Sequence, residues 1–305
     1  MAAYIIKRLG IGALTLFALI TITFFLTRLM PGNPFDADNS SKTVVDQLMR
    51  EYRLDRPIGE QYAAYISNVF RGDLGVSFKK PGTSVNSIVA RGFKATLSVG
   101  LLAFGISMAL GVALGIWQAT TRSGLVRGAL LALSTLGVSI PNYVLALLLM
   151  MAFSVRLKLF PVIGLGTPAH YVLPVATMAA YPVAVISRLV KNTFGEAMSQ
   201  EYVTLARAKG LGTAQIRLVH VLKNAILPVI TTSGPMLAFL MTGSFVVESL
   251  FTVQGIGREF VSAVSNRDYT VIMGLSIFMG GLIILANLLS DVANGIVDPR
   301  VKLGK

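Results

Sequence analysis

Long apolar blocks, separated by more polar segments, dominate the pattern of this chain. The hydrocarbon core of a bilayer is about 30 Å thick, so a helix needs roughly 20 apolar residues to cross it. Blocks approaching or exceeding this length run approximately from Leu9 to Leu29, Ala95 to Gln118, Ala129 to Val155, Val172 to Ile186, Ile226 to Val247 and Val271 to Leu289. They lack the recurring alternation of apolar and polar residues that marks the strands of a membrane barrel. The pattern therefore predicts an all-α, polytopic membrane protein with six transmembrane helices.

The polar segments divide the chain into three parts. We expect a transmembrane helix in residues 1–30, an external segment in residues 31–94 and a core of five transmembrane helices in residues 95–305. The second block contains Gly111 and Gly115, a spacing that lets helix backbones approach closely in lipid. Four prolines of the later blocks can break helices, either beside a pathway cavity or as packing kinks: Pro141, Pro182, Pro228 and Pro235.

The external segment looks folded. Residues 44–53 are spaced like a short amphipathic helix, and residues 72–75 form a Gly-Asp-Leu-Gly turn signal. Its aromatic residues either cover the outer mouth of a pathway or form a small packed cap, and we prefer the packed cap. These residues are Tyr52, Tyr62, Tyr65, Phe70 and Phe78.

Composition and charge agree with a membrane location. Hydrophobic residues make up 54% of the chain and charged residues only 13%, while the formal net charge is +13. No basic stretch is interleaved with aromatic residues, so the excess charge indicates topology and not nucleic-acid binding. Because Lys7 and Arg8 precede the first block, and an even number of spans places both termini on one side, we expect both termini in the cytoplasm. The protein is then a multi-pass membrane protein in contact with the lipid bilayer.

Residues 190–225 form the longest cytoplasmic loop in this topology. Ser199 is a candidate cap for a helix from Gln200 to Lys209, and Thr213 for a second helix from Ala214 to Asn224. Gly210-Leu211-Gly212 lies between them as a hinge. On the first helix one face carries Tyr202, Leu205 and Ala206, and on the second one face carries Ile216, Val219 and Leu222.

The chain shows no chemistry of its own for driving transport. It lacks the glycine-rich phosphate loop of ATPases and has no cysteine. The charged residues Arg188, Glu248 and Asp291 lie at the ends of blocks, where anchoring or pairing is the simplest interpretation. His170 and His220 fall on opposite sides of the membrane, so an intramembrane hydrolase finds no catalytic constellation. We predict a protein that is not an enzyme, with no catalytic, cofactor-binding or metal-binding residues. A transport subunit that receives its energy from partner proteins agrees with these absences; a stand-alone secondary transporter, a channel and a membrane scaffold are the alternatives to it.

The hinged loop resembles the ATPase-docking loop of ABC importer permeases, whose consensus is E-A-A-x3-G-x9-I-x-L-P. In this register Ala206-Arg207-Ala208 is followed by Gly212 and by Leu222, while the glutamate and the Leu-Pro are replaced. Longer stretches are similar to the first permease subunit of the bacterial dipeptide and oligopeptide importers, which implies a multi-pass protein of a bacterial inner (plasma) membrane. The similar stretches are residues 30–35, 54–58, 72–78, 139–141, 159–161, 201–211, 255–257 and 298–300, with Gln61, Tyr62, His220, Asn224, Pro228, Glu248, Phe251 and Asp291.

This resemblance implies a heteromeric importer of peptides or a related small solute. Its other parts would be a second homologous permease, two ATP-binding subunits that carry Mg-ATP and hydrolyse it, and an extracytoplasmic solute-binding protein. It also implies that a set of loop residues contacts an ATPase: Glu201, Tyr202, Ala206, Arg207, Ala208, Gly210, Leu211, Gly212, His220 and Asn224. Relatives in this branch import dipeptides, oligopeptides, nickel, glutathione or other solutes, and the sequence does not choose among these or identify substrate-binding residues.

Overall fold

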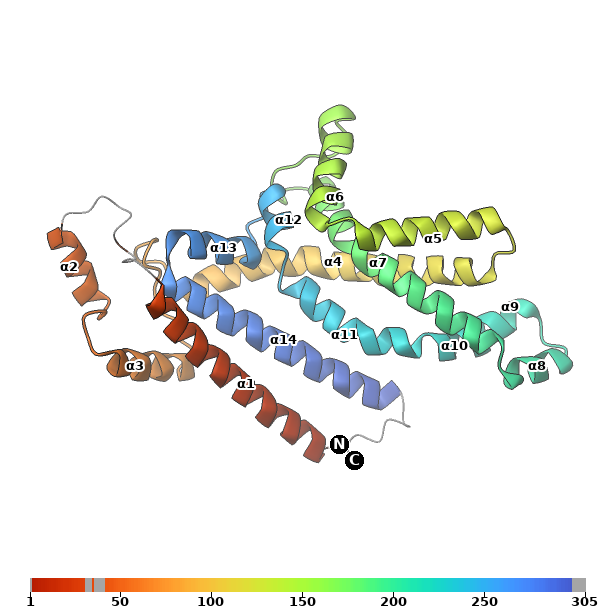
Figure 1. Ribbon diagram of the computed structural model, residues 1–305, viewed down its shortest axis with the longest axis horizontal. Coiled ribbons are helices and arrows are strands. Elements are labelled where there is room, and N and C mark those ends of the chain that lie inside the picture. The colour runs from red at the N-terminus through yellow and green to blue at the C-terminus, as the bar shows by residue number, and fades with distance from the viewer. Residues whose placement is uncertain (1, 31–34, 36–41, 298–305) are drawn as a thin grey trace.

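The computed structural model describes residues 2–30, 35 and 42–297, and within these ranges the regular elements are helical (Figure 1). In chain order they are α1 (Ala2–Leu29), α2 (Lys42–Glu51), α3 (Ile58–Phe70), α4 (Val85–Thr120), α5 (Gly124–Ser139), α6 (Asn142–Leu149), the π-helix η2 (Met150–Arg156), α7 (Pro168–Met198), α8 (Glu201–Ala208), α9 (Thr213–Gln215), the π-helix η3 (Ile216–Val221), α10 (Leu222–Ala225), α11 (Leu227–Met241), α12 (Phe245–Leu250), α13 (Ile256–Asn266) and α14 (Tyr269–Val297). Residues 31–34 and 298–300 of the sequence resemblance lie outside the described residues.

The apolar helices confirm the all-α, polytopic membrane class. Among the described residues, five helical stretches are long and apolar enough to cross a bilayer, namely Ile5–Leu29, Val85–Thr120, Pro168–Met198, Leu227–Leu250 and Tyr269–Val292. A sixth exists if the pair formed by α5 and the helix from Asn142 to Arg156 is counted as one span, although this pair bends by 111°. The number of six spans therefore stays a prediction.

The prolines do not act alike. The predicted block from Ala129 to Val155 is not one straight helix, because Pro141 follows an extended Ile140 and separates α5 from α6. Pro182, by contrast, lies inside the continuous helix α7, which extends well beyond the predicted limits Val172 and Ile186. Pro235 likewise lies inside α11, and Pro228 occupies its first turn, where a missing N–H leaves no bond unmade. The expectation of a break is met only at Pro141.

The glycine pair of the second block brings α4 and α7 into contact. A Cβ added at Gly111 would lie 2.7 Å from Cβ of Ile186, and one added at Gly115 would lie 2.6 Å from Cβ of Val190. Such close approach confirms the packing predicted from the spacing. A buried chain of side chains adds α5: Gln118 donates to Ser134 Oγ at 3.0 Å, which lies 3.0 Å from Ser187 Oγ.

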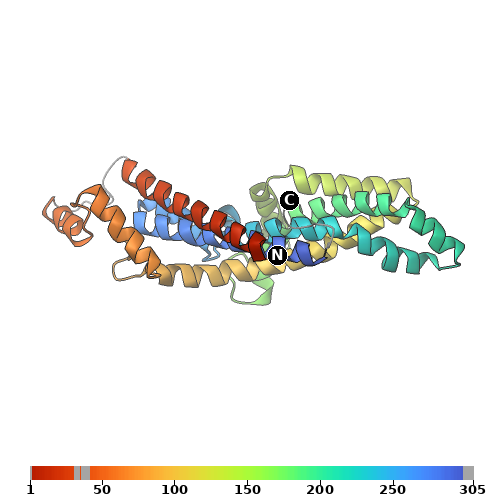
Figure 2. The ribbon, with the colours of Figure 1, turned by 90° about the horizontal axis from the view of Figure 1, so that it is seen from below.

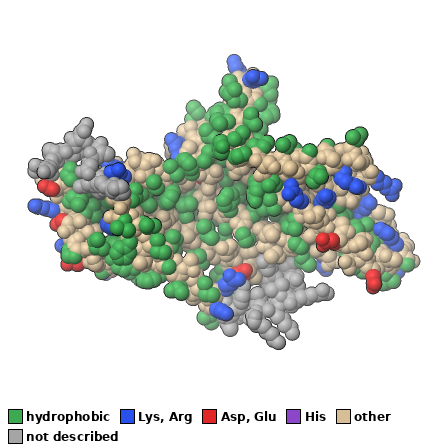
Figure 3. All heavy atoms as spheres, viewed as in Figure 1, with side chains coloured by type: hydrophobic (Ala, Val, Ile, Leu, Met, Phe, Trp, Pro, Cys, Tyr) green, Lys and Arg blue, Asp and Glu red, His purple; other side chains and the backbone are tan. Residues whose placement is uncertain are grey.

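Helices α1 and α14 pack side by side, as both ribbon views show (Figure 2). An ion pair of 3.1 Å between Arg8 Nε and Asp291 Oδ2 joins them, which accounts for the charged residue predicted at the end of the last block. Helix α1 exposes apolar side chains such as Leu14 and Leu26, as expected for a surface in contact with lipid tails. Apolar side chains cover much of the face in Figure 3, and Lys and Arg gather toward the end that carries α8 to α10.

The segment that we predict to be external packs on α1 as a cap. Tyr62 and Tyr65 contact Phe24 with ring centroids 5.3 and 5.9 Å apart, and Tyr52 contacts Phe78 at 4.7 Å. Phe70 instead is 83% exposed and is not part of this packing. The packed cap is therefore confirmed for the other four aromatic residues. The predicted turn at residues 72–75 is also present, with positive φ at both glycines.

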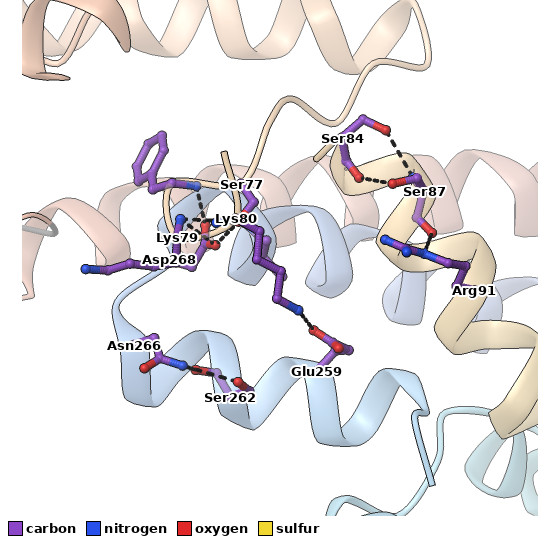
Figure 4. Close-up of polar contacts among 12 residues, drawn as sticks. Ser77, Lys79, Lys80, Ser84, Ser87, Arg91, Glu259, Ser262, Asn266 and Asp268 are labelled. Carbon is purple, nitrogen blue, oxygen red and sulfur yellow. Dashed lines mark hydrogen bonds and ion pairs between the residues drawn. The ribbon is translucent and has the colours of Figure 1, made fainter. Parts of the chain in front are cut away.

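A buried carboxylate fastens this segment to the corner between α13 and α14 (Figure 4). Asp268 accepts a short hydrogen bond from Ser77 Oγ and a bond of 3.1 Å from the N–H of Phe78. Lys80 Nζ lies 2.7 Å from Glu259 Oε2 on α13. Charge-assisted bonds of this kind fix the outer segment against the helical core.

Candidate functional site

The predicted loop lies at one end of the molecule. Helices α8 and α9 lie at the end of α7 and α10 packs beside it, at the opposite end of the long axis from α2 and α3 (Figures 1 and 2). His170 lies at the start of α7 and His220 follows its end, and the part of α7 from His170 to Met198 is about 42 Å long at 1.5 Å per residue. This arrangement agrees with the predicted separation of the external segment and the loop by the membrane.

The helix ends of the loop differ from the prediction. Ser199 does not cap the first helix, because its Oγ donates to the carbonyl of Glu196 at 2.7 Å and the residue ends α7. Helix α8 begins after Gln200, without a side-chain cap. Thr213 is itself the first residue of α9, and Gly212 occupies the N-cap position.

Gly210 closes α8 with a Schellman motif. Its N–H donates to the carbonyl of Arg207 at 2.9 Å, and the N–H of Leu211 donates to the carbonyl of Ala206 at 3.2 Å. This pattern requires a left-handed residue between the helix and Leu211, and Gly210 has φ +77°. Leu211 then packs on the buried cluster below the turn. The turn thus depends on glycine at this one position.

Gly212 does not share this requirement, which corrects the expectation that both hinge glycines provide unusual backbone freedom. Its φ is −64° and its ψ is 146°, an ordinary extended conformation. A Cβ added there would meet nothing within 4 Å. Any small residue fits, so Gly212 is not a conformational hinge.

An apolar cluster holds the loop on the end of α7. Its buried members are Phe194, Ala197, Val203, Ala206, Ile216, Val221 and Ala225, and Tyr202 and Leu222 pack against it. Leu205 and Val219 share their predicted faces with buried Ala206 and Ile216, but they are 58% and 56% exposed. For Val219 the reason is the π-helix η3, whose i→i+5 bonds shift the register and bury Val221. On α8, Val203 and Ala206 form the buried side.

The remaining predicted site residues lie mainly on the surface of the loop. Glu201 is exposed in the first turn of α8, where a negative charge complements the helix dipole. Arg207, Ala208 and Asn224 are also exposed. His220 is half-buried, and its carbonyl accepts a bond of 3.1 Å from Asn224 Nδ2. These residues belong to one compact structure, although only some of them are accessible.

The loop presents apolar and basic side chains to the outside. Leu205, Leu218 and Val219 are each more than half exposed, and Arg207 and Lys223 are exposed on the same segment. Apolar side chains anchored on a rigid, cluster-backed turn are typical of a protein-docking surface.

A second structural centre surrounds Glu248, which the sequence analysis treated as a simple anchor. Only 3% of this residue is exposed. Its carboxylate accepts a hydrogen bond of 2.8 Å from Thr96 Oγ1 and one of 2.9 Å from the N–H of Arg258. Thr96 Oγ1 in turn accepts a hydrogen bond of 2.9 Å from the N–H of Ile256. The carboxylate therefore joins α4, α12 and the start of α13. Its charge at the first turn of α13 is also favourable for the helix dipole.

Three glycines make room for this carboxylate. A Cβ added at Gly243, Gly255 or Gly257 would lie 2.4, 2.4 and 3.1 Å from an oxygen of Glu248. The sequence signals that pointed to this site were the Gly-Ile-Gly spacing at residues 255–257 and the presence of Glu248 and Phe251 in the family resemblance. Helix α12 turns back into the bundle here, and Phe251 is buried in the cluster that contains Leu173 and Met178 of α7.

Comparison with known proteins identifies the family. Residues 111–303 match the family described as "Binding-protein-dependent transport system inner membrane component", and residues 1–100 match its N-terminal companion. The chain is 41% identical to the dipeptide transport system permease protein DppB of Bacillus subtilis, over 100% of this chain and 99% of that protein. It is 36% identical to the oligopeptide transport system permease protein OppB of Escherichia coli K12, over 99% and 100% of the two chains.

A solved structure supports the fold. An inward-facing conformation of the MetNI methionine ABC transporter superposes with a TM-score of 0.54 over 69% of this chain and 96% of that chain, at 19% identity. The resemblance given by the sequence motifs is confirmed by the family matches, and the stand-alone alternatives are less well supported than an importer subunit. The chain therefore belongs to the inner membrane components of binding-protein-dependent transport systems, and it is a permease subunit of an ATP-driven ABC importer.

Proposed function

We propose that this chain pairs with a second, homologous permease and that the two together form the translocation pathway for di- or oligopeptides. The support is the similarity to permeases named for dipeptides and oligopeptides, which extends over essentially the whole chain. A solute-binding protein delivers the substrate on the external side. Mg-ATP is bound and hydrolysed by two partner subunits, and this chain contributes no catalytic residue.

The observation that carries the proposal is the rigid loop at the end of α7. The Schellman turn at Gly210 and the cluster around Val203 and Ile216 fix the shape of α8 to α10. Exposed Leu205, Leu218 and Val219 then enter a groove of an ATPase subunit. A rigid knob transmits the closure of the ATPases to the bundle, which rocks between inward and outward openings.

The orientation follows from the same assignment. The loop lies in the cytoplasm with the ATPases, together with both termini, while α2 and α3 at the opposite end lie outside. The basic residues Lys7 and Arg8 on the first turns of α1 agree with a cytoplasmic N-terminus.

Replacing Leu218 by aspartate tests the docking assignment. Leu218 is 61% exposed, so the substitution leaves the fold intact, but it places a charge in an apolar interface and weakens ATPase binding by about 2 kcal/mol or more. The measurement is copurification of the ATPase subunits with the permease, normalised to permease abundance in the membrane, alongside ATP-driven peptide uptake. Phe70→Asp, at an even more exposed apolar residue of the opposite end, is the control and retains the ATPases. Undiminished ATPase recovery with Leu218→Asp would remove the loop from the interface.

A further inference from the structure

A cavity of about 710 Å³ lies between the external end of α1, helix α3 and the start of α14. We call it the outer cavity. The residues used below that line it are Phe24, Arg28, Tyr52, Gln61, Tyr65 and Phe78. Its wall is mixed, with aromatic rings next to polar and charged side chains. A volume of this size holds a small organic ligand, and mixed walls are typical of ligand sites.

The wall contains a concentration of polar atoms that lack partners. Among the described residues, five buried side-chain nitrogen or oxygen atoms make no hydrogen bond, and three of them belong to this wall: Arg28 Nε, Gln61 Oε1 and Tyr65 Oη. Buried polar groups are nearly always paired, so each exception requires an explanation. Three exceptions around one cavity indicate a polar network that is completed by something outside the chain.

Each of the three atoms has a defined capacity. Gln61 Nε2 donates to the carbonyls of Leu54 and Arg56 at 3.1 and 2.8 Å, which leaves the amide oxygen as a free acceptor. Burial raises the pKa of Tyr65, so its phenol keeps the proton and can donate. Arg28 is a permanent donor with a positive charge. The three lining residues therefore carry two donors and one acceptor that have no partner.

Arg28 is placed like a ligand-binding cation. Its guanidinium lies over the ring of Phe24 at 5.1 Å and over the ring of Tyr269 at 5.9 Å, which orients its plane. It forms no ion pair in the part of the chain that the structure describes. Of the other charged residues on the wall, Asp73 accepts the N–H of Gly75 at 2.9 Å, and Glu51 and Arg53 are exposed.

We propose that the outer cavity binds the C-terminal residue of a peptide. The carboxylate pairs with Arg28 and accepts the Tyr65 hydroxyl, and the last amide N–H of the peptide donates to Gln61 Oε1. The aromatic rings of Tyr52 and Phe78 contact the terminal side chain. Because the three polar atoms are shielded from solvent in the present conformation, their side chains turn toward the cavity when the peptide enters.

This inference rests on the proposed peptide substrate and adds a recognition site to it. A free carboxylate forms a bidentate, charge-assisted pair with arginine, which an amide does not. We therefore expect a peptide acid to bind at least about tenfold more tightly than the corresponding C-terminal amide. The site would select for a free C-terminus before the peptide enters the pathway.

The test measures binding of Ala-Phe and of Ala-Phe amide to the complete permease–ATPase complex in nanodiscs of zwitterionic lipid, without the binding protein. Wild type prefers the acid about tenfold or more, while Arg28→Gln and Tyr65→Phe reduce acid binding toward the level of the amide. Tyr65→Phe removes only an unpaired hydroxyl, so it preserves the fold even if Arg28→Gln does not. The controls are Arg71→Gln, an exposed cation on the same side, and Tyr62→Phe, whose hydroxyl bonds Thr21 instead; both retain the preference.

Two outcomes show that the cavity does not recognise a C-terminal carboxylate: equal binding of acid and amide, or a preference for the acid that survives both Tyr65→Phe and Arg28→Gln. A third outcome, loss of acid binding when phosphatidylglycerol is added to the nanodiscs, would assign the cavity to a lipid headgroup. ATP-driven uptake of Ala-Phe by the reconstituted wild-type importer is measured separately. Uptake without Arg28-dependent binding refutes the site alone, whereas Arg28-dependent binding without uptake supports the site and refutes peptide transport.

Discussion

The contrast between Gly210 and Gly212 allows the conformational role of the loop to be tested within three residues. Gly210 has φ +77° and closes the Schellman motif, whereas Gly212 has φ −64° and open space around its Cα. Valine at 210 must either adopt a left-handed conformation or unmake the turn. Valine at 212 fits the existing backbone.

The magnitude follows from the backbone. A non-glycine residue held in the left-handed region costs on the order of 1 to 3 kcal/mol, and a β-branched residue lies toward the upper end. If the substitution makes the native turn the minor conformation, the apparent affinity for an ATPase falls by up to about 5-fold for 1 kcal/mol and about 150-fold for 3 kcal/mol. Gly212→Val changes the affinity by less than about twofold, because no strain is introduced.

The assay compares ATPase copurification and ATP-driven uptake for wild type, Gly210→Val and Gly212→Val, at equal membrane abundance. We expect Gly210→Val to insert normally, since the apolar spans are unchanged. Both ATPase copurification and ATP-driven uptake should fall in this variant. Wild-type recovery with Gly210→Val would show that the turn is not needed for docking. Equal losses in both variants would show that backbone conformation is not the cause, because only one of the two positions is strained.

Three further predictions concern the bundle. Gly115→Ala places a methyl group 2.6 Å from Cβ of Val190 and should lower the free energy of unfolding of the purified protein by about 1 to 3 kcal/mol. Gly105→Ala, which has open space around it, should leave this free energy unchanged, and equal stability of the two variants would contradict the packing. Glu248→Gln puts an amide against the donors of Thr96 and Arg258 and should lower the free energy of unfolding by about 1 to 3 kcal/mol. Glu60→Gln, at an exposed residue, is the control; an unchanged free energy of unfolding for Glu248→Gln would show that the carboxylate is dispensable. In this cysteine-free chain, the variant Phe70→Cys should react with a membrane-impermeant thiol reagent in intact cells whose outer membrane has been made permeable, while Gln215→Cys should not react. The reverse labelling would invert the proposed orientation.

Several features of the fold were predictable because they depend on local sequence. A block such as Ala95–Gln118 is expected to be helical in lipid, since only helices and closed barrels satisfy the backbone there and the block lacks the alternation of a barrel strand; it lies within α4. Gly111 and Gly115 are one helical turn apart, so their shared face was known before its partner was. The loop was also predictable as two short helices around a glycine turn.

Other features depended on residues far apart in the sequence. The exposure of Val219 follows from the π-helix η3, whereas a periodicity of 3.6 residues places Val219 on the same face as buried Ile216. Helix α7 continues through Pro182, which is buried among neighbouring side chains, so the proline alone did not predict whether the helix breaks there. Gly212 and Gly210 look alike in the sequence, and only the backbone angles separate them.

By itself the sequence determined the membrane class, the approximate spans, the loop and the family, because apolar length, glycine spacing and motifs act locally or are carried by the residues themselves. The tertiary structure decided what the isolated charges do. Glu248 lies 152 residues from Thr96, and Arg28 is far along the chain from Tyr65 and Tyr269, so no pattern along the chain brings them together. Whether a buried charge is paired, or left open to a ligand, is fixed only when distant helices pack around it.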